Sequence, residues 1–164
     1  REFKGVMFYK NYTKPFETSY IDLLADDMCQ PDIDEVFASN GVDPKTAVSH
    51  SVMNSDRIVC YFDGDQLLAI GGVGLNVNGS GSPWLLSTNY LNDWKRENLR
   101  TFLECSKSWI DDMNDMYPLL ENYVDARNTE SITWLKHLGF YFPETIPDYG
   151  YLKVPFIKFV KYND

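Results

Sequence analysis

The sequence predicts a mixed α/β fold of the α+β kind, formed by residues 1–164 as a single domain. Short runs of aromatic and β-branched residues alternate with segments in which apolar residues recur at helical spacing. Asp63-Gly64-Asp65 separates two of the strand-like runs, which is a strong signal for a β-hairpin. A segment that begins near Leu91 keeps the helical period for about six turns, which indicates a long core helix.

Composition excludes several classes of protein. The net charge of −9 repels phosphate backbones, so we expect no nucleic-acid partner. No apolar run approaches the roughly 20 residues that a membrane-spanning helix needs, so we expect no membrane association. Cys29, Cys60 and Cys105 are odd in number and lack the spacing of metal ligands, which predicts reduced, buried thiols in a cytoplasmic protein without a metal site.

The first third of the chain predicts one strand and then short helices. Residues 3–12 suit a first strand, and residues 15–27 carry apolar side chains at helical spacing with acidic residues on the other face. Pro31 opens a second helix that runs through Phe37 and stops near Asn40-Gly41. Residues 46–53 fit a third short helix.

The next segment predicts a hairpin and a central strand. Residues 58–62 and 67–70 are its two strands, and Gly71 and Gly72 are expected to end or bulge the second one. Residues 77–82 read as a loop, and residues 83–87 as a third strand. Asn92 or Asp93 can cap the long helix that follows, and Pro118 forbids its continuation.

The last third predicts a strand, a short helix and a closing hairpin. Tyr123 and Val124 are strand formers, and an apolar stripe then recurs at spacings of three, at Ile132, Leu135 and Leu138. Gly139 is expected to end the helix in the left-handed conformation, with Phe140 packed back onto the stripe. Residues 140–142 and 149–162 then form a hairpin around residues 143–148.

This order of elements, and Asn128 before a short helix that ends in Leu138-Gly139-Phe140, resembles the GNAT acetyltransferase fold. The resemblance implies a mixed, mostly antiparallel sheet whose central strands splay apart, with acyl-CoA entering the gap. A narrower similarity involves Leu68-Ala69-Ile70-Gly71-Gly72, the strand end at residues 84–88, and Asn122-Tyr123-Val124. These motifs resemble the GNAT-like family of internal virion protein A, the gene-thirteen product of short-tailed coliphages. That implies a phage protein, located in the bacterial host cytoplasm during infection or in the virion.

The GNAT resemblance implies acetyl-CoA as cofactor. In that family a glycine-rich segment holds the CoA pyrophosphate at a helix N-terminus, but the corresponding residues 87–96 contain no glycine and include Asp93. The cofactor contacts that the resemblance implies are Leu86, Ser87, Thr88, Lys95, Arg96, Asn128 and Trp134. Lys95 and Arg96 can equally form a solvated helix face. If Asn128 does contact the cofactor, Asn128→Ala should lower acetyl-CoA affinity without unfolding the domain.

Proton transfer in GNAT enzymes often uses a tyrosine at the position that is Leu135 here. Tyr123 or Tyr141 can substitute as catalytic acid from neighbouring strands, although either also fits a core or rim position. His50 is the candidate catalytic base on the acceptor side. Two functions remain open. One is an N-acetyltransferase acting on a small amine or a protein amino group. The other is a catalytically inactive protein that acts in virion assembly or binds a host or phage protein, with a homodimer also open.

Overall fold

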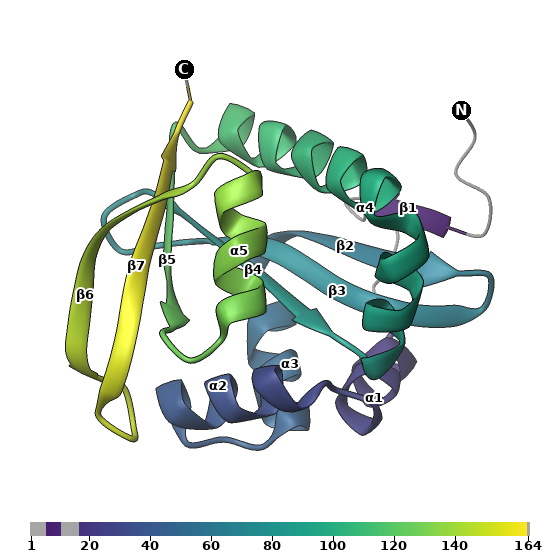
Figure 1. The fold of residues 1–164 in the computed structure, drawn as a ribbon, viewed down its shortest axis with the longest axis horizontal. Helices are drawn as coiled ribbons and strands as arrows, with labels where there is room; N and C mark the ends of the chain where they lie inside the picture. The colour runs from purple at the N-terminus through teal and green to yellow at the C-terminus, as the bar shows by residue number, and fades with distance from the viewer. Residues whose placement is uncertain (1–5, 11–16, 164) are drawn as a thin grey trace.

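The computed structural model describes residues 6–10 and 17–163, which form a seven-stranded sheet covered by helices (Figure 1). The strands are β1 (Val6–Lys10), β2 (Ser55–Asp63), β3 (Gln66–Leu75), β4 (Gly81–Ser87), β5 (Leu119–Asp125), β6 (Tyr141–Tyr149) and β7 (Val154–Tyr162). The helices are α1 (Ser19–Asp26), α2 (Gln30–Asn40), α3 (Pro44–Met53), α4 (Asn89–Met116) and α5 (Thr129–His137).

The sheet has the strand order β1-β2-β3-β4-β5-β7-β6, and its neighbouring strands are antiparallel except for β4 and β5. The parallel pair β4 and β5 is joined at one register position, Gly81 opposite Leu120, and the two strands then diverge. Figure 1 shows the resulting gap, with α5 in front of it and α2 across its open end. The predicted mixed, mostly antiparallel sheet with splayed central strands is therefore confirmed.

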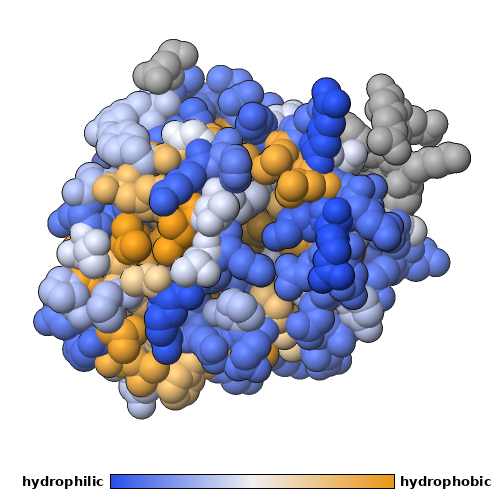
Figure 2. Space-filling view, in the orientation of Figure 1, coloured by the Kyte–Doolittle hydropathy of each residue, from blue (hydrophilic) through white to orange (hydrophobic). Residues whose placement is uncertain are grey.

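Two apolar cores lie on opposite faces of the sheet, because side chains alternate along a strand. Val59 and Tyr61 of β2 face the core that α4 and α5 cover, whereas Ile58, Cys60 and Phe62 face the core under α1, α2 and α3. The three cysteines are free and buried, as predicted. On the face shown in Figure 2, hydrophilic residues dominate along α4, and hydrophobic residues gather around the region of α5 and β7.

The N-terminal elements agree with the prediction within the described residues. β1 covers the centre of the predicted strand 3–12, whose other residues lie outside the described part of the chain, as do residues 15 and 16 of the predicted first helix. α2 ends at Gly41, whose φ of 68° is the left-handed conformation expected of a helix-ending glycine. α3 starts earlier than predicted, because Asp43 caps it and Pro44 occupies its first turn.

The predicted β2–β3 hairpin is confirmed, but the role given to Gly71 and Gly72 is wrong. β3 continues through both glycines to Leu75, and its register with β4 is unbroken there. A Cβ atom on Gly72 would lie 2.7 Å from Trp84 Nε1, so this glycine is required by the close approach of the indole rather than by a bulge. The predicted loop is also shorter, because β4 already begins at Gly81.

The start of α4 differs from the prediction. The N-cap is Thr88, and neither Asn92 nor Asp93 caps the helix. The helix is kinked at Asn98, whose φ of −124° is not helical and whose side-chain amide donates to the Trp94 carbonyl at 2.9 Å. Leu99, the residue after the kink, is 51% exposed.

The turn of the C-terminal hairpin lies at a different position from the one predicted. Residues 143–148 belong to β6 and do not form the turn, which comes between β6 and β7 at residues 150–153. β6 is an edge strand with two register shifts, so it accommodates Pro143 and Pro147 without breaking a central ladder. The short helix α5 follows the prediction: Gly139 has a φ of 92°, and buried Phe140 donates its backbone N–H to the Leu135 carbonyl.

Candidate functional site

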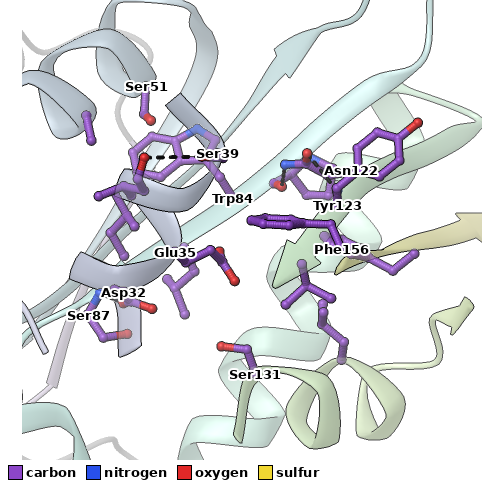
Figure 3. Close-up of a pocket in the computed structure, with 18 of the residues that line it drawn as sticks. Asp32, Glu35, Ser39, Ser51, Trp84, Ser87, Asn122, Tyr123, Ser131 and Phe156 are labelled. Atoms are coloured by element: carbon purple, nitrogen blue, oxygen red, sulfur yellow. Dashed lines mark hydrogen bonds between the residues drawn. The ribbon is translucent and has the colours of Figure 1, made fainter. Parts of the chain in front are cut away.

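The divergence of β4 and β5 leaves a cavity of about 270 Å³ between them (Figure 3). Helices α2 and α3 and strands β4 to β7 supply much of its lining, and residues of α4 and α5 complete it. Asn122 holds the strands at the start of the gap, since its side-chain amide donates to the Pro83 carbonyl at 2.8 Å. The more exposed lining residues, Asn40 and His50, come from α2 and α3, so the mouth of the cavity lies on that side.

Two carboxylates of α2 occupy the open ends of the diverging strands. Asp32 and Glu35 are three residues apart and therefore project from one face of the helix. The Ser87 backbone N–H at the end of β4 donates to Asp32 Oδ2 at 2.8 Å. The Asp125 backbone N–H at the end of β5 donates to Glu35 Oε1 at 2.9 Å. Helix α2 thus satisfies donors that the parallel pairing of β4 and β5 leaves free.

Asn128 connects this arrangement to α5. Its side-chain oxygen accepts from the Ser131 backbone N–H at 3.3 Å and caps the helix, while its amide group donates to Glu35 Oε1 at 3.3 Å. The residue is buried, and its hydrogen-bonding groups serve α5 and Glu35. Replacing it by alanine would therefore remove the cap of α5 and a donor to Glu35, and the expectation that Asn128→Ala lowers acetyl-CoA affinity without unfolding the domain stays a prediction.

Burial raises the pKa of both α2 carboxyl groups. The pKa of Asp32 is raised to about 6 by desolvation, against the lowering effect of the Ser87 N–H. The pKa of Glu35 is raised to about 8 by desolvation and then by the negative charge of Asp32. Glu35 is consequently mostly protonated at neutral pH. Among the described residues that line the cavity, none is a lysine or arginine that would oppose these shifts directly.

Aromatic rings form much of the remaining wall. Tyr149 stacks on Tyr123 with ring centroids 4.8 Å apart and lies 4.5 Å from the Phe156 ring. Across the cavity, Trp84 is fixed by a hydrogen bond from its indole N–H to Ser55 Oγ at 2.7 Å. In Figure 3 the Glu35 side chain points away from α2 toward the side where Asn122, Tyr123 and Phe156 lie.

The groove between α4 and α5 is filled by a second aromatic group. The Phe102 ring stacks on Trp134 at a centroid distance of 5.7 Å and meets Trp94 edge-on at 6.4 Å. The Lys95 ammonium lies 5.7 Å from the centre of the same Phe102 ring. These rings therefore pack α5 against α4.

The junction between β4 and α4 is a single residue, Thr88. Its backbone N–H donates to the Leu68 carbonyl at 2.8 Å, and the Asn89 N–H donates to the Asp27 carbonyl at 2.9 Å. The connection between α1 and α2 therefore lies against the N-terminus of α4. It is held there by a further bond at 2.9 Å, from the Cys29 N–H to the Ser87 carbonyl.

The structure brings part of the predicted site together. The predicted residues that line the cavity are His50, Leu86, Ser87, Tyr123 and Trp134. Asn128 reaches it through Glu35. Their predicted catalytic and cofactor roles stay predictions.

Five predicted residues, Asn128 and four others, lie outside the cavity lining. Thr88 is fully buried and donates its hydroxyl to β3 carbonyl groups. Lys95 covers Phe102, Arg96 pairs with Asp93 on the exposed helix face, and Tyr141 stacks on Tyr162 at 6.2 Å.

Asp32 and Glu35 are the site residues that the sequence analysis missed. An acidic pair at this spacing reads as the solvated face of a helix. One signal was present, because Asp32 lies four residues before the apolar Val36 and so shares the face that packs inward. No local sequence pattern indicated that the hydrogen-bond donors to these carboxylates would be the ends of β4 and β5.

Comparison with solved structures identifies the fold. Ard1 from Thermoplasma volcanium superimposes with a TM-score of 0.69 at 12% identity, covering 96% of this chain and 97% of that one. A Bacillus subtilis acetyltransferase in complex with CoA gives 0.66 at 9% identity, covering 97% and 99%. An acetyltransferase of the GNAT family from Streptococcus pneumoniae gives 0.61 at 12% identity, covering 97% and 99%. The protein therefore has the GNAT fold.

A match to a family model assigns the chain to a group of proteins narrower than the fold. Residues 59–146, more than half of the chain, match the family model described as "Bacteriophage T7, probable scaffold protein Gp13". The protein belongs to this phage family, in agreement with the resemblance to a phage gene-thirteen product. Comparison with curated proteins finds no match.

The residues at the start of α4 do not fit a CoA pyrophosphate. Phosphate binding at a helix N-terminus needs backbone N–H groups that point at the ligand. Here the N–H groups of Thr88 and Asn89 are bonded to carbonyl groups, and Asp32 occupies the donor at Ser87. These three donors are therefore not available to a pyrophosphate.

No helix in the described part of the chain combines the length and the apolar character needed to cross a membrane. Within residues 6–10 and 17–163, no group of histidine, cysteine and acidic side chains is arranged to hold a metal ion.

Proposed function

We propose that this protein is an assembly protein of a bacteriophage that works by binding other proteins and uses the GNAT fold without acetyl transfer. The proposal depends on one observation. The backbone N–H groups where β4 meets α4 already donate hydrogen bonds to other parts of this chain. Asp32 takes the Ser87 N–H, and the α1–α2 connection takes the Asn89 N–H. The GNAT mechanism polarises the thioester and holds the phosphates through backbone N–H groups, and we expect these donors to be the corresponding groups in this chain.

Cofactor binding would therefore require two rearrangements. The Trp94, Phe102 and Trp134 rings would have to separate to open the groove between α4 and α5. The Asp32 carboxylate would have to leave a donor that it contacts at 2.8 Å in a buried site. Each change exposes apolar surface or leaves a buried polar group unpaired, so each costs stability.

The family description supports a role in particle assembly, since it names a probable scaffold protein of bacteriophage T7. The net charge of −9 suits partners with basic surfaces. We place the protein in the cytoplasm of the infected bacterium during assembly, with the virion as a further location.

An N-acetyltransferase is the second candidate, and one observation favours it. Glu35 lies in the cavity beside the β4–β5 gap, and its raised pKa suits a general base for an amine, with His50 near the mouth. The acceptor would be a small amine or a protein amino group, and acetyl-CoA would have to displace the α1–α2 connection.

Calorimetric titration with acetyl-CoA separates the two candidates, with desulfo-CoA as second ligand and thermal unfolding as an independent readout. We expect no binding heat and no rise in melting temperature at millimolar cofactor. Micromolar binding with a raised melting temperature would overturn the proposal in favour of the enzyme.

The assembly role is tested in a phage from which this gene is deleted. We expect infected cells to accumulate particles that lack one or more components, and the gene supplied in trans to restore them. Particles of normal composition and normal yield without the gene would contradict an assembly role.

A further inference from the structure

We infer that the end of β3 and the β3–β4 loop (residues 76–80) present an apolar tip that inserts into an uncharged apolar pocket on a partner protein. The inference rests on the proposed function, because it names the surface through which an assembly protein would bind. The apolar tip consists of Met53, Leu75 and Val77. These are the three most exposed large hydrophobic side chains in the described part of the chain, since Met53 is 81% exposed, Leu75 is 66% exposed and Val77 is fully exposed.

The three side chains lie together at one end of the sheet. Leu75 is the last residue of β3, and Val77 belongs to the loop that follows. Met53 ends α3, and the carbonyl oxygen of the next residue, Asn54, lies so close to Gly74 that a Cβ atom on Gly74 would overlap it. None of the three lines the cavity between β4 and β5. Single exposed apolar residues are ordinary on a protein surface, whereas a cluster of them indicates an interaction site.

Hydrogen bonds hold the β3–β4 loop in one shape. The Asn76 backbone N–H donates to the Ser80 carbonyl at 2.8 Å, and the Gly79 N–H donates to the Asn76 carbonyl at 3.0 Å. The Asn76 side-chain amide donates to Ser80 Oγ at 2.9 Å, and the Ser80 hydroxyl donates to Asn78 Oδ1 at 2.6 Å. Val77 lies between the two asparagines, so this set of bonds fixes the position from which it projects.

The loop is also anchored to β5. The Asn78 side-chain amide donates to Glu121 Oε2 at 2.9 Å, and the Asn76 amide donates to the Glu121 carbonyl at 3.3 Å. Glu121 is buried, and its other carboxylate oxygen pairs with Lys158 of β7 at 3.1 Å. Leu120 faces the core under α4 and α5, so Glu121 points to the opposite face, and Figure 1 shows the loop crossing behind β5 and β7. A partner thus meets a preformed surface and does not have to order the loop.

The apolar tip carries no charge in an otherwise acidic protein. No charged residue occurs between Asp65 and Asp93, although 24% of the residues in the chain are charged and its net charge is −9. Glu121 and Lys158, which lie under the loop, neutralise each other. The centres of protein interfaces are depleted in charged residues. A pocket that covers the tip therefore buries apolar side chains without desolvating an unpaired charge, which favours an uncharged, apolar pocket.

A second copy of this chain is a poor occupant for the apolar tip. A two-fold symmetric contact places the same surface on both sides, so one projecting loop would meet another. Such a contact buries far less than the roughly 800 Å² per partner of a stable interface, and two chains of charge −9 repel each other. A concave pocket on a different protein encloses the same side chains on several sides, as interface anchors require.

Photocrosslinking in infected cells tests the contact. The gene is supplied in trans to a phage that lacks it, with Leu75 replaced by benzoylphenylalanine and Val77 intact. We expect a crosslink to one other protein, through a peptide of mostly apolar, uncharged residues. Adding Val77→Asp should reduce this product at least about tenfold, and the fold should be unaffected because the side chain is fully exposed.

The matched control carries the same photoreactive residue at Leu99, an exposed leucine of α4, and should not give this product. Four results would overturn the inference. They are the absence of a product, a product that Val77→Asp leaves unchanged, an equal product from position 99, and a crosslink only to lipid or to a second copy of this chain.

NMR relaxation of the isolated, labelled protein tests whether the loop is preformed. We expect backbone order parameters of about 0.85 at Val77 and Gly79, as in ordered strands. Asn78→Ala removes the bond to Glu121 and an acceptor for Ser80, so it should lower these values below about 0.6. It should also reduce the crosslinked product at least about threefold with Val77 unchanged. Values below about 0.6 in the natural protein would contradict the preformed tip.

The failure of this inference and that of the proposed function are distinguishable. If the crosslink forms while particles made without the gene are normal, the apolar tip stands and the assembly role is refuted. If no crosslink forms while particles made without the gene lack components, the assembly role stands and the apolar tip is not its binding surface.

Discussion

Replacing Glu35 by glutamine should stabilise the protein at alkaline pH. Glu35 is half-buried at the cavity, and its pKa is raised from 4.5 to about 8, chiefly by desolvation. A carboxyl group with a raised pKa in the folded state favours folding below its unfolded pKa, and this contribution is lost as pH rises through the folded pKa. Stability should therefore fall between about pH 5 and about pH 8 in the natural protein. Glutamine stays neutral and removes the Glu35 part of this fall.

The magnitude follows from the size of the shift. One pKa unit corresponds to about 1.36 kcal/mol, so the rise of the Glu35 pKa sets an upper limit of roughly 5 kcal/mol. Water reaches part of the side chain through the cavity mouth and reduces this cost. We expect the variant to be more stable than the natural protein by about 2 to 3 kcal/mol at about pH 9.

Urea unfolding followed by tryptophan fluorescence at several pH values measures this difference. Above about pH 6 the pH dependence of stability reports mainly on Glu35. Asp32 has a pKa of about 6, so its contribution to that dependence falls mainly below this pH. Asp34→Asn is the control for the loss of one negative charge on the same helix. If the stability curves of Glu35→Gln and the natural protein run parallel from neutral to alkaline pH, Glu35 is not desolvated in the folded state and the reasoning is wrong.

Two further substitutions test the packing around the site. Asn128→Ala should destabilise the protein by about 1 to 2 kcal/mol, because it removes the cap on Ser131 and a donor to Glu35. Thermal and urea unfolding measure it, and a loss no larger than that of an exposed helix substitution would contradict the capping role. Gly72→Ala should cost about 1 to 3 kcal/mol, because the new Cβ would lie 2.7 Å from Trp84 Nε1. Unchanged stability, together with an unshifted indole N–H signal in NMR, would show that the strands separate easily there.

Elements with a strong local pattern were predictable from the sequence. Asp63-Gly64-Asp65 between two strand-like runs identified the β2–β3 hairpin, because a turn needs a residue that accepts positive φ and Gly64 has a φ of 58°. Gly139 likewise marked the end of α5. Predictions were wrong where tertiary contacts determined the local structure. Gly72 reads as a strand breaker in the sequence, yet in the sheet it makes room for an indole from the neighbouring strand.

The sequence by itself determined the order of strands and helices and the resemblance to GNAT and phage proteins, since both depend on local pattern and spacing. The tertiary structure decided what fills the cleft. Asp32 and Ser87 are 55 residues apart, and Glu35 and Asp125 are 90 apart. Whether a carboxylate faces solvent or closes the end of a strand depends on how α2 packs across β4 and β5, which no helical period encodes. The same packing raises the pKa of Glu35, because only burial removes the water that would otherwise stabilise its charge.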